Sequence, residues 1–185
     1  ILGFYALWAL VWQFYTRFWM GGPMSPYRPE GNIKFELLAP FEKGHILGSD
    51  LYGRSLLEVL SSGLTYSLGM ALTVSLACAT IGIIVGYLSA KFHGFLRQFL
   101  ETLTNLIFVF PSILIAIMIM SVTGQSFWGL VFSLVVTGWP AYARIARGES
   151  LRVLGFTYIE SAKSIGVGEF RLFFTAVLPA IMPIM

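Results

Sequence analysis

Two long stretches of this sequence carry no charged side chain, and they constrain the fold more than any other feature. No Asp, Glu, Lys or Arg occurs between Glu58 and Lys91, or between Glu101 and Arg144. A helix that crosses a bilayer needs roughly 20 apolar residues, so the first gap holds one span and the second has room for two. Charged residues make up 11% of the chain, whereas soluble domains typically carry about 25%. The chain therefore belongs in a membrane.

The apolar runs predict an all-α membrane protein, a polytopic helical bundle, because a helix satisfies its own backbone hydrogen bonds in lipid. We expect spans at residues 1–16, 66–90, 99–120 and 127–143, and the start of a fifth near Leu178. Pro111 and Pro140 are expected to bend the third and fourth spans. The chain begins without a methionine and ends in an apolar run too short to cross a bilayer. We therefore expect it to be truncated at both ends.

Basic residues predict the orientation, because they stay on the cytoplasmic side of a membrane. Acidic and basic residues balance between positions 17 and 65, whereas the segments around positions 91–101 and 144–171 hold the whole excess of three positive charges. The second set is expected in the cytoplasm. Residues 1–20 then form the first transmembrane helix, residues 21–65 an external loop with an interfacial helix at 55–64, and residues 66–185 a transmembrane core.

Small residues in the second span lie three or four positions apart, which places them on one helical face. They are Ala71, Ser75, Ala79, Gly82, Gly86 and Ala90. Such faces allow helix backbones to approach closely in lipid, so we predict a packing face here.

The chain has too few cysteines and histidines for a metal site or a disulfide of its own. The chain has one cysteine, Cys78, and two histidines, His45 and His93. A disulfide or a multi-ligand metal site within the chain is therefore excluded, and Cys78 is interpreted as a small packing residue. The sequence also lacks the G-x-x-x-x-G-K-S/T pattern of a phosphate-binding loop, so any ATP would be bound by another polypeptide.

The polar segment 144–177 is too hydrophilic to be embedded in lipid. Its pattern predicts two short helices on the cytoplasmic face, separated near Gly166 and Gly168, with the chain re-entering the membrane near Pro179. Small apolar residues beside basic ones make this segment suitable for docking a soluble partner.

Two motifs of this sequence, one at 45–54 and one at 160–179, resemble those of one family, the permease subunits of binding-protein-dependent ABC importers. The cytoplasmic motif of that family is Glu-Ala-Ala, three residues, Gly, nine residues and Ile-x-Leu-Pro. The matching residues here are Glu160, Ser161, Ala162, Gly166, Leu178 and Pro179, with Ser161 and Ala176 departing from the consensus. The external segment is similar to that of the dipeptide, oligopeptide and nickel permeases through His45, Gly48, Asp50, Gly53 and Arg54.

The resemblance implies the transmembrane domain of a type I ABC importer that moves di- or oligopeptides across the inner membrane. It implies a second permease subunit, two cytoplasmic ATPase subunits that bind ATP and Mg²⁺, an external solute-binding protein and surrounding lipid as partners, and no nucleic acid. Residues 160–166 would couple the ATPases to transport, and the chain itself would be no enzyme. For Asp50, Arg54 and His45 we favour a structural role in the loop. Substrate-binding residues stay unknown.

Alternative functions remain open. The same motifs fit a permease for nickel or another small solute. A channel or secondary transporter would need polar groups within the spans, for which the candidates are Thr73, Thr104, Asn105, Thr123 and Gln125. A membrane anchor that carries no solute would use segment 144–177 only as an interaction site.

Overall fold

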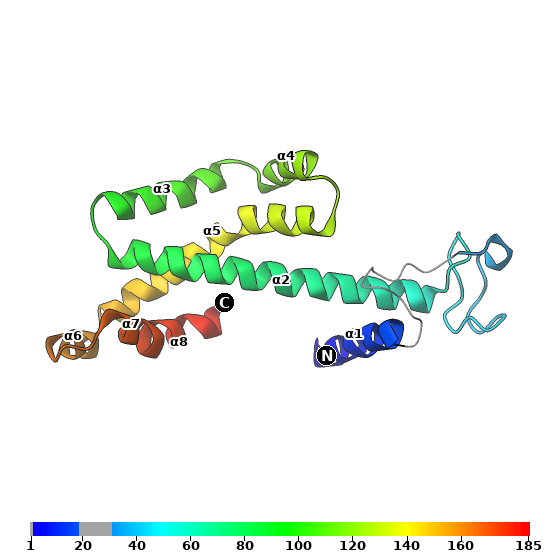
Figure 1. Ribbon diagram of the computed structural model, residues 1–185, viewed down its shortest axis with the longest axis horizontal. Helices are drawn as coiled ribbons and strands as arrows, with labels where there is room; N and C mark the ends of the chain where they lie inside the picture. The colour runs from blue at the N-terminus through cyan, green and yellow to red at the C-terminus, as the bar shows by residue number, and fades with distance from the viewer. Residues whose placement is uncertain (1, 19–30) are drawn as a thin grey trace. The chain divides into compact units, whose positions relative to one another are not determined.

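The computed structural model describes residues 2–18 and 31–185 of the chain. It divides into two compact units, Ile1–Leu72 and Thr73–Met185. Each unit is described by itself below, and Figure 1 gives the labels of the helices.

The first unit combines a helix, a compact loop and the beginning of a long helix. Helix α1 spans Leu2–Phe18 and α2 spans Leu56–Lys91, with the short 3₁₀ helix η1 at Ile33–Phe35 between them. The indole Nε1 of Trp8 donates to the Ser61 hydroxyl at 3.0 Å, and that of Trp12 donates to the Ser62 hydroxyl at 3.3 Å. These bonds hold α1 against the first turns of α2. Most of the Pro- and Gly-rich run at 21–32 lies outside the described residues.

The predicted interfacial helix at 55–64 is not a separate element. It continues without a break into the second span, so that α2 is a single helix of 36 residues. No proline lies near the junction, and the two glycines on either side of it, Gly63 and Gly69, are both helical. An isolated glycine costs a helix only about 1 kcal/mol, which tertiary contacts readily offset.

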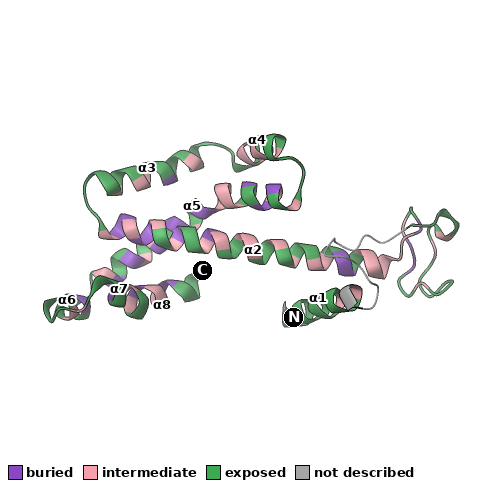
Figure 2. Cartoon of the chain, in the orientation of Figure 1, coloured by how far each residue is buried: buried purple, intermediate pink, exposed green. Residues whose placement is uncertain are grey.

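The second unit is built on close contact between α2 and α5 (Phe127–Leu154). A Cβ atom placed on Gly82 would lie 2.4 Å from the Tyr142 Cβ, and one on Gly86 would lie 2.6 Å from the Ala143 carbonyl oxygen. The second half of the predicted small-residue face is therefore confirmed as a packing face, whereas Ala71 and Ser75 are exposed. Figure 2 shows buried residues on both of these helices.

Cys78 lies in this α2–α5 contact, as its interpretation as a packing residue predicted. Its side chain is 1% exposed and belongs to a buried cluster with Trp139 and Ala143. The thiol lies 3.8 Å from the carbonyl oxygen of Val135 on α5.

The predicted third span is a bent pair of helices. Helix α3 (Phe95–Val109) and α4 (Ser112–Thr123) meet at an angle of 90° across Phe110 and Pro111. The bend predicted at Pro111 is thus confirmed, and it is a complete break because proline disfavours a helical conformation in the residue before it. Both helices contact α5, and in Figure 1 α4 lies beside its first turns.

The predicted fourth span continues beyond its expected end. Helix α5 extends to Leu154, with Pro140 inside it, so residues 144–154 belong to this helix instead of a separate surface helix. Next come α6 (Thr157–Ser164), α7 (Glu169–Leu172), the π-helix η2 (Phe173–Val177), α8 (Leu178–Ile181) and the 3₁₀ helix η3 (Met182–Ile184). The break predicted near Gly166 and Gly168 separates α6 from α7. The helix expected to start near Leu178 already begins at Glu169.

Within the described residues, α2 and α5 are long and apolar enough to cross a bilayer, and the bent pair α3–α4 would make a third span. No strand forms in this part of the chain. The predicted helical membrane protein is therefore confirmed.

Candidate functional site

The motif that begins at Glu160 forms the helix α6 and the turn that ends it. Gly166 has a φ of +83°, which lies in the left-handed region where glycine is strongly favoured. Its N–H donates to the Lys163 carbonyl at 3.0 Å, and the Val167 N–H donates to the Ala162 carbonyl at 3.0 Å. This pair of bonds defines a Schellman cap. The glycine of the motif therefore ends α6 and turns the chain towards α7.

The same cap explains the small residue at position 162. In a Schellman cap the residue after the glycine packs on a residue about five positions before itself, which here are Val167 and Ala162. Both Val167 and Ala162 pack against a buried cluster that includes Ile159 and Val153. Ile159 is 1% exposed, so it anchors α6 to the end of α5. One face of α6 is thus fixed and the other is free for contact.

The free face of α6 carries the other residues of the motif. Glu160 and Ser161 are exposed. The hydroxyl of Ser161 donates to the Thr157 carbonyl at 3.0 Å, so the serine at this position is satisfied within the helix. Two apolar side chains that follow in the sequence are also exposed, Ile165 at the end of α6 at 83% and Phe170 on α7 at 84%.

Leu178 and Pro179 lie in the helix that returns from α6. Proline has no N–H for the carbonyl four residues earlier, and its ring clashes with that carbonyl. The preceding turn is the π-helix η2, in which the Leu178 N–H donates to the Phe173 carbonyl. The wider π turn is a physical means of placing a proline in a continuing helix. Pro179 is exposed and Leu178 is half-buried.

The motif from His45 to Arg54 folds into a compact loop in the first unit, directly before α2. Gly48 and Gly53 are buried and have φ values of +80° and +69°. A Cβ on Gly53 would lie 1.8 Å from the Asn32 carbonyl oxygen, and one on Gly48 would lie 2.3 Å from the Leu38 carbonyl oxygen. Both positions therefore require glycine, for conformation as well as for space.

Asp50 organises the turn between these glycines. Its Oδ1 accepts the N–H groups of Tyr52 and Arg54, both at 2.9 Å, and its Oδ2 accepts from the Arg54 Nε at 2.7 Å. Partial burial alone would raise the pKa of this carboxyl. The hydrogen bonds from the backbone and side chain of Arg54 and from the Tyr52 backbone outweigh it and hold the pKa below its usual value of 3.8.

His45 contributes to the same loop through its backbone and its ring. Its carbonyl accepts the N–H groups of Phe41 at 2.9 Å and Gly48 at 3.2 Å. Its ring centroid lies 5.5 Å from that of Phe35. The described contacts of His45 are thus with the loop itself. The loop belongs to the first unit, and α6 belongs to the second.

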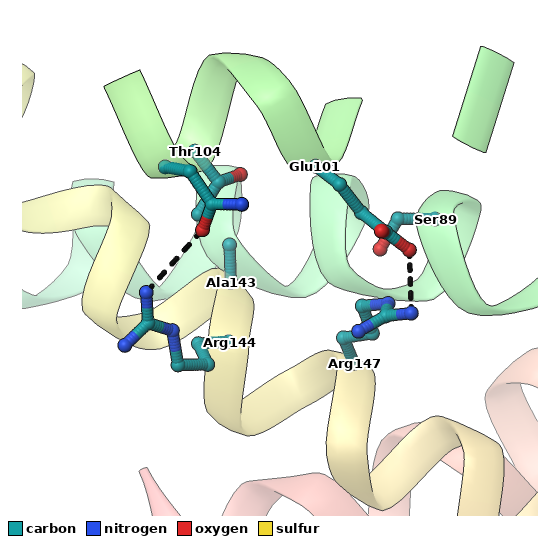
Figure 3. A pocket seen from close by; sticks show the side chains of 7 residues that line it. Ser89, Glu101, Thr104, Ala143, Arg144 and Arg147 are labelled. Carbon is teal, nitrogen blue, oxygen red and sulfur yellow. Dashed lines mark hydrogen bonds and ion pairs between the residues drawn. The ribbon is translucent and has the colours of Figure 1, made fainter. Parts of the chain in front are cut away.

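A polar cluster that the sequence did not predict lies between α2, α3 and α5 in the second unit. Glu101 on α3 pairs with Arg97 at 2.7 Å and with Arg147 on α5 at 2.5 Å. Arg144 donates to the Asn105 side-chain oxygen at 3.4 Å and lies over the Phe108 ring, 4.3 Å from its centroid. Figure 3 shows Arg144 and Arg147 extending from α5 towards α3. Glu101 and Arg147 are 46 positions apart, so spacing gave no signal for their pairing.

Comparison with known proteins gives the family. Residues 79–185 match the family described as the binding-protein-dependent transport system inner membrane component. The chain is 30% identical over 158 residues to the glutathione transport system permease protein GsiD of Pectobacterium atrosepticum, covering 84% of this chain and 52% of that protein.

Two further relatives have related names. The di/tripeptide transport system permease protein DppC of Pseudomonas aeruginosa is 29% identical over 165 residues, which cover 86% of this chain and 54% of DppC. The oligopeptide transport system permease protein OppC of Lactococcus lactis is 26% identical over 149 residues, which cover 80% of this chain and 51% of OppC. The chain thus spans about half the length of these relatives. With more than half of its residues matched, it belongs to the family of inner membrane components of binding-protein-dependent transport systems.

Proposed function

We propose that this protein is a permease subunit of an ATP-driven importer that moves di- or oligopeptides across the plasma membrane of a bacterium or archaeon. The observation that carries the proposal is the structure of α6, which is anchored on one face and exposed on the other. The names of the relatives support peptides as the transported class. They give no support to the nickel alternative.

The exposed side of α6 is suited to receive a soluble ATPase. Glu160 supplies a charge there, and Ile165 and Phe170 supply apolar area that a partner would bury. Because Ile159 fixes α6 to the buried cluster, a movement of α6 would be passed to α5 instead of being absorbed by a loose loop. ATP and Mg²⁺ would be bound by the partner ATPase, since this sequence has no phosphate-binding loop.

The remaining partners follow from the family to which the chain belongs. A second permease subunit would complete the pathway, two ATPase subunits would bind in the cytoplasm, and a solute-binding protein would deliver peptide from outside. The excess of basic residues supports a cytoplasmic position for α6. The compact loop that Asp50 organises before α2, which we call the Asp50 loop, would then lie on the side of the solute-binding protein.

A pair of glycine substitutions tests the coupling role of α6. Gly166→Ala places a Cβ at a φ of +83°, whereas Gly168→Ala meets nothing within 4 Å and keeps an ordinary φ of −65°. The first substitution should cost about 1 kcal/mol at the cap. We expect faster amide exchange at Val167, by about fivefold, and less ATPase recovered when the protein is purified with its neighbouring gene products. Gly168→Ala should change neither.

A charge substitution tests the contact itself. Glu160→Arg should reduce recovery of the ATPase without changing amide exchange at the cap, because the Glu160 side chain is exposed. Glu36→Arg, the same change at an exposed carboxylate of the first unit, is the matched control. If no ATPase accompanies the unaltered protein, the importer function is refuted. Equal recovery with all variants would instead exclude α6 as the coupling site.

A further inference from the structure

The polar cluster between α2, α3 and α5 surrounds a small open pocket of about 70 Å³. We call it the arginine pocket. Its lining comes from Arg144, Arg147 and Ala143 on α5, Glu101, Thr104 and Asn105 on α3, and Ser89 on α2. Figure 3 shows the two arginine side chains on one side of the pocket and Glu101 on the other. One water needs only about 10–15 Å³ of such volume, so the pocket has room for a small polyatomic anion.

Positive charge is in excess at the arginine pocket. Glu101 is the carboxylate in the lining, and it already pairs with both Arg97 and Arg147. Arg144 has no ion pair among the described residues, in contrast to Lys91, which pairs with Glu169, and Arg152, which pairs with Glu149. Of the two arginines that line the pocket, Arg144 therefore has no counter-charge in this part of the chain, and Arg147 shares the Glu101 carboxylate with Arg97, which lies outside the lining.

One buried hydrogen-bond donor at the pocket lacks an acceptor among the described residues, and the exposed Arg144 beside it has donors to spare. The Nε of Arg147 is buried and has no hydrogen-bond partner within the described part of the chain, and a buried donor left unpaired is costly. Arg144 uses one of its five N–H groups, in a long bond of 3.4 Å to the Asn105 oxygen. In that arrangement the amide nitrogen of Asn105 is directed to donate as well.

The hydroxyl groups of the pocket point their protons at their own helices. Ser89 donates to the Gly86 carbonyl at 2.9 Å, and Thr104 donates to the Leu100 carbonyl at 2.8 Å. Neither hydroxyl accepts from the Arg147 Nε, which has no partner in the described part of the chain. Donor groups from Arg144, Arg147 and Asn105 thus line one cavity, and one of these donors is buried without a described partner. An anion with several oxygen atoms satisfies them together, since a guanidinium fork matches phosphate and carboxylate geometry.

The position of the pocket along the helices favours phosphate. Arg144 marks the end of the long uncharged stretch of sequence, where arginine side chains reach the membrane interface. Anionic phospholipid head groups lie at this level, and basic pockets between transmembrane helices on the cytoplasmic side bind them. We propose that the arginine pocket is a phosphate-binding site, occupied by the head group of an anionic phospholipid or by a soluble phosphate.

Native mass spectrometry of the purified protein, with any subunits that remain bound, tests the site. Phosphatidylglycerol is compared with phosphatidylethanolamine for the unaltered protein and for Arg144→Gln. Loss of one charge-assisted contact should lower the preference for phosphatidylglycerol about tenfold. Arg152→Gln removes the same charge from the same helix but leaves the pocket intact, so it should retain the preference. Binding of lipid requires no ATPase, so the result is independent of the importer proposal.

Inorganic phosphate distinguishes the two sources. The site takes soluble phosphate if two results are found together. Millimolar phosphate raises the thermal stability of the unaltered protein but not that of Arg144→Gln, and neither protein prefers phosphatidylglycerol to phosphatidylethanolamine. Arg144→Lys, which keeps the charge and loses the fork, should bind with intermediate affinity and replaces Arg144→Gln if that variant misfolds. Unchanged lipid preference in the substituted protein together with no response to phosphate overturns the proposal.

Discussion

Gly86→Ala is expected to separate α2 from α5. A Cβ on residue 86 would lie 2.6 Å from the Ala143 carbonyl oxygen and the Ala146 Cβ, and 2.8 Å from the Arg147 nitrogen. Non-bonded carbon atoms are most stable at about 3.5–4.0 Å. Two of the three atoms belong to the backbone, so a change of side-chain rotamer cannot relieve the contact. The helices must move apart by about 1 Å.

The size of the effect follows from two opposing contributions. Overpacking of this kind costs about 1–3 kcal/mol, whereas replacing glycine by alanine within a helix stabilises it by about 1 kcal/mol. Gly148→Ala on α5 is a matched control, because its Cβ meets nothing within 4 Å and only the helix-forming contribution applies. The two variants should therefore differ by about 1–3 kcal/mol, or about 5- to 150-fold in the population with the helices apart.

Cys78 provides the assay. It is the one cysteine of the chain and is 1% exposed against α5, so a maleimide reaches it only when the helices separate. When separation is fast and reversible, the labelling rate follows the open population. Gly86→Ala should be labelled faster than Gly148→Ala by the factor given above. Equal labelling rates for the two variants would refute the packing of α2 on α5 through this face.

Two further predictions concern the Asp50 loop. Gly53→Ala should open the loop to proteolysis more than Gly44→Ala, because both residues have positive φ but only Gly53 contacts a backbone oxygen, that of Asn32. A clear excess of cleavage in the Gly44 variant would contradict this. Because the folded pKa of Asp50 is lowered, its contribution to loop stability is complete above the usual value of 3.8 and is lost as the pH falls through the folded pKa. Amide exchange at Tyr52, corrected for its intrinsic pH dependence, should accelerate over this acidic range, and Asp50→Asn should abolish that response.

The sequence predicted helices correctly where charged residues give way to a long apolar stretch. The uncharged stretches predicted α2 and α5, and Pro111 predicted the break between α3 and α4. The predicted helix ends were wrong wherever a helix continues beyond the apolar residues of its span. Residues 144–154 of α5 are polar yet helical, because arginine and glutamate are good helix formers and only the apolar part of a helix needs lipid.

The two motifs were informative because each contains glycines with a conformational requirement. Gly166 ends α6 and Gly53 closes the external loop, both at positive φ, so spacing along the sequence carries structural meaning there. The arginine pocket lacked such a signal. Its members come from three helices, and the Glu101–Arg147 pair forms where α3 and α5 are in contact. Tertiary packing, which a single sequence does not display, determines that site.

Helix α5 links the two sites of the second unit. At its end, Val153 lies in the buried cluster with Ile159 of α6 and Leu172 of α7. Two turns earlier, Arg147 pairs with Glu101 of α3, and its backbone nitrogen faces Gly86 of α2. A displacement of α6 must move Ile159, and close-packed side chains cannot absorb it by compression. Occupation of the arginine pocket would strengthen the link between α5 and α3, so a bound phosphate should alter how far a movement of α6 reaches into the bundle.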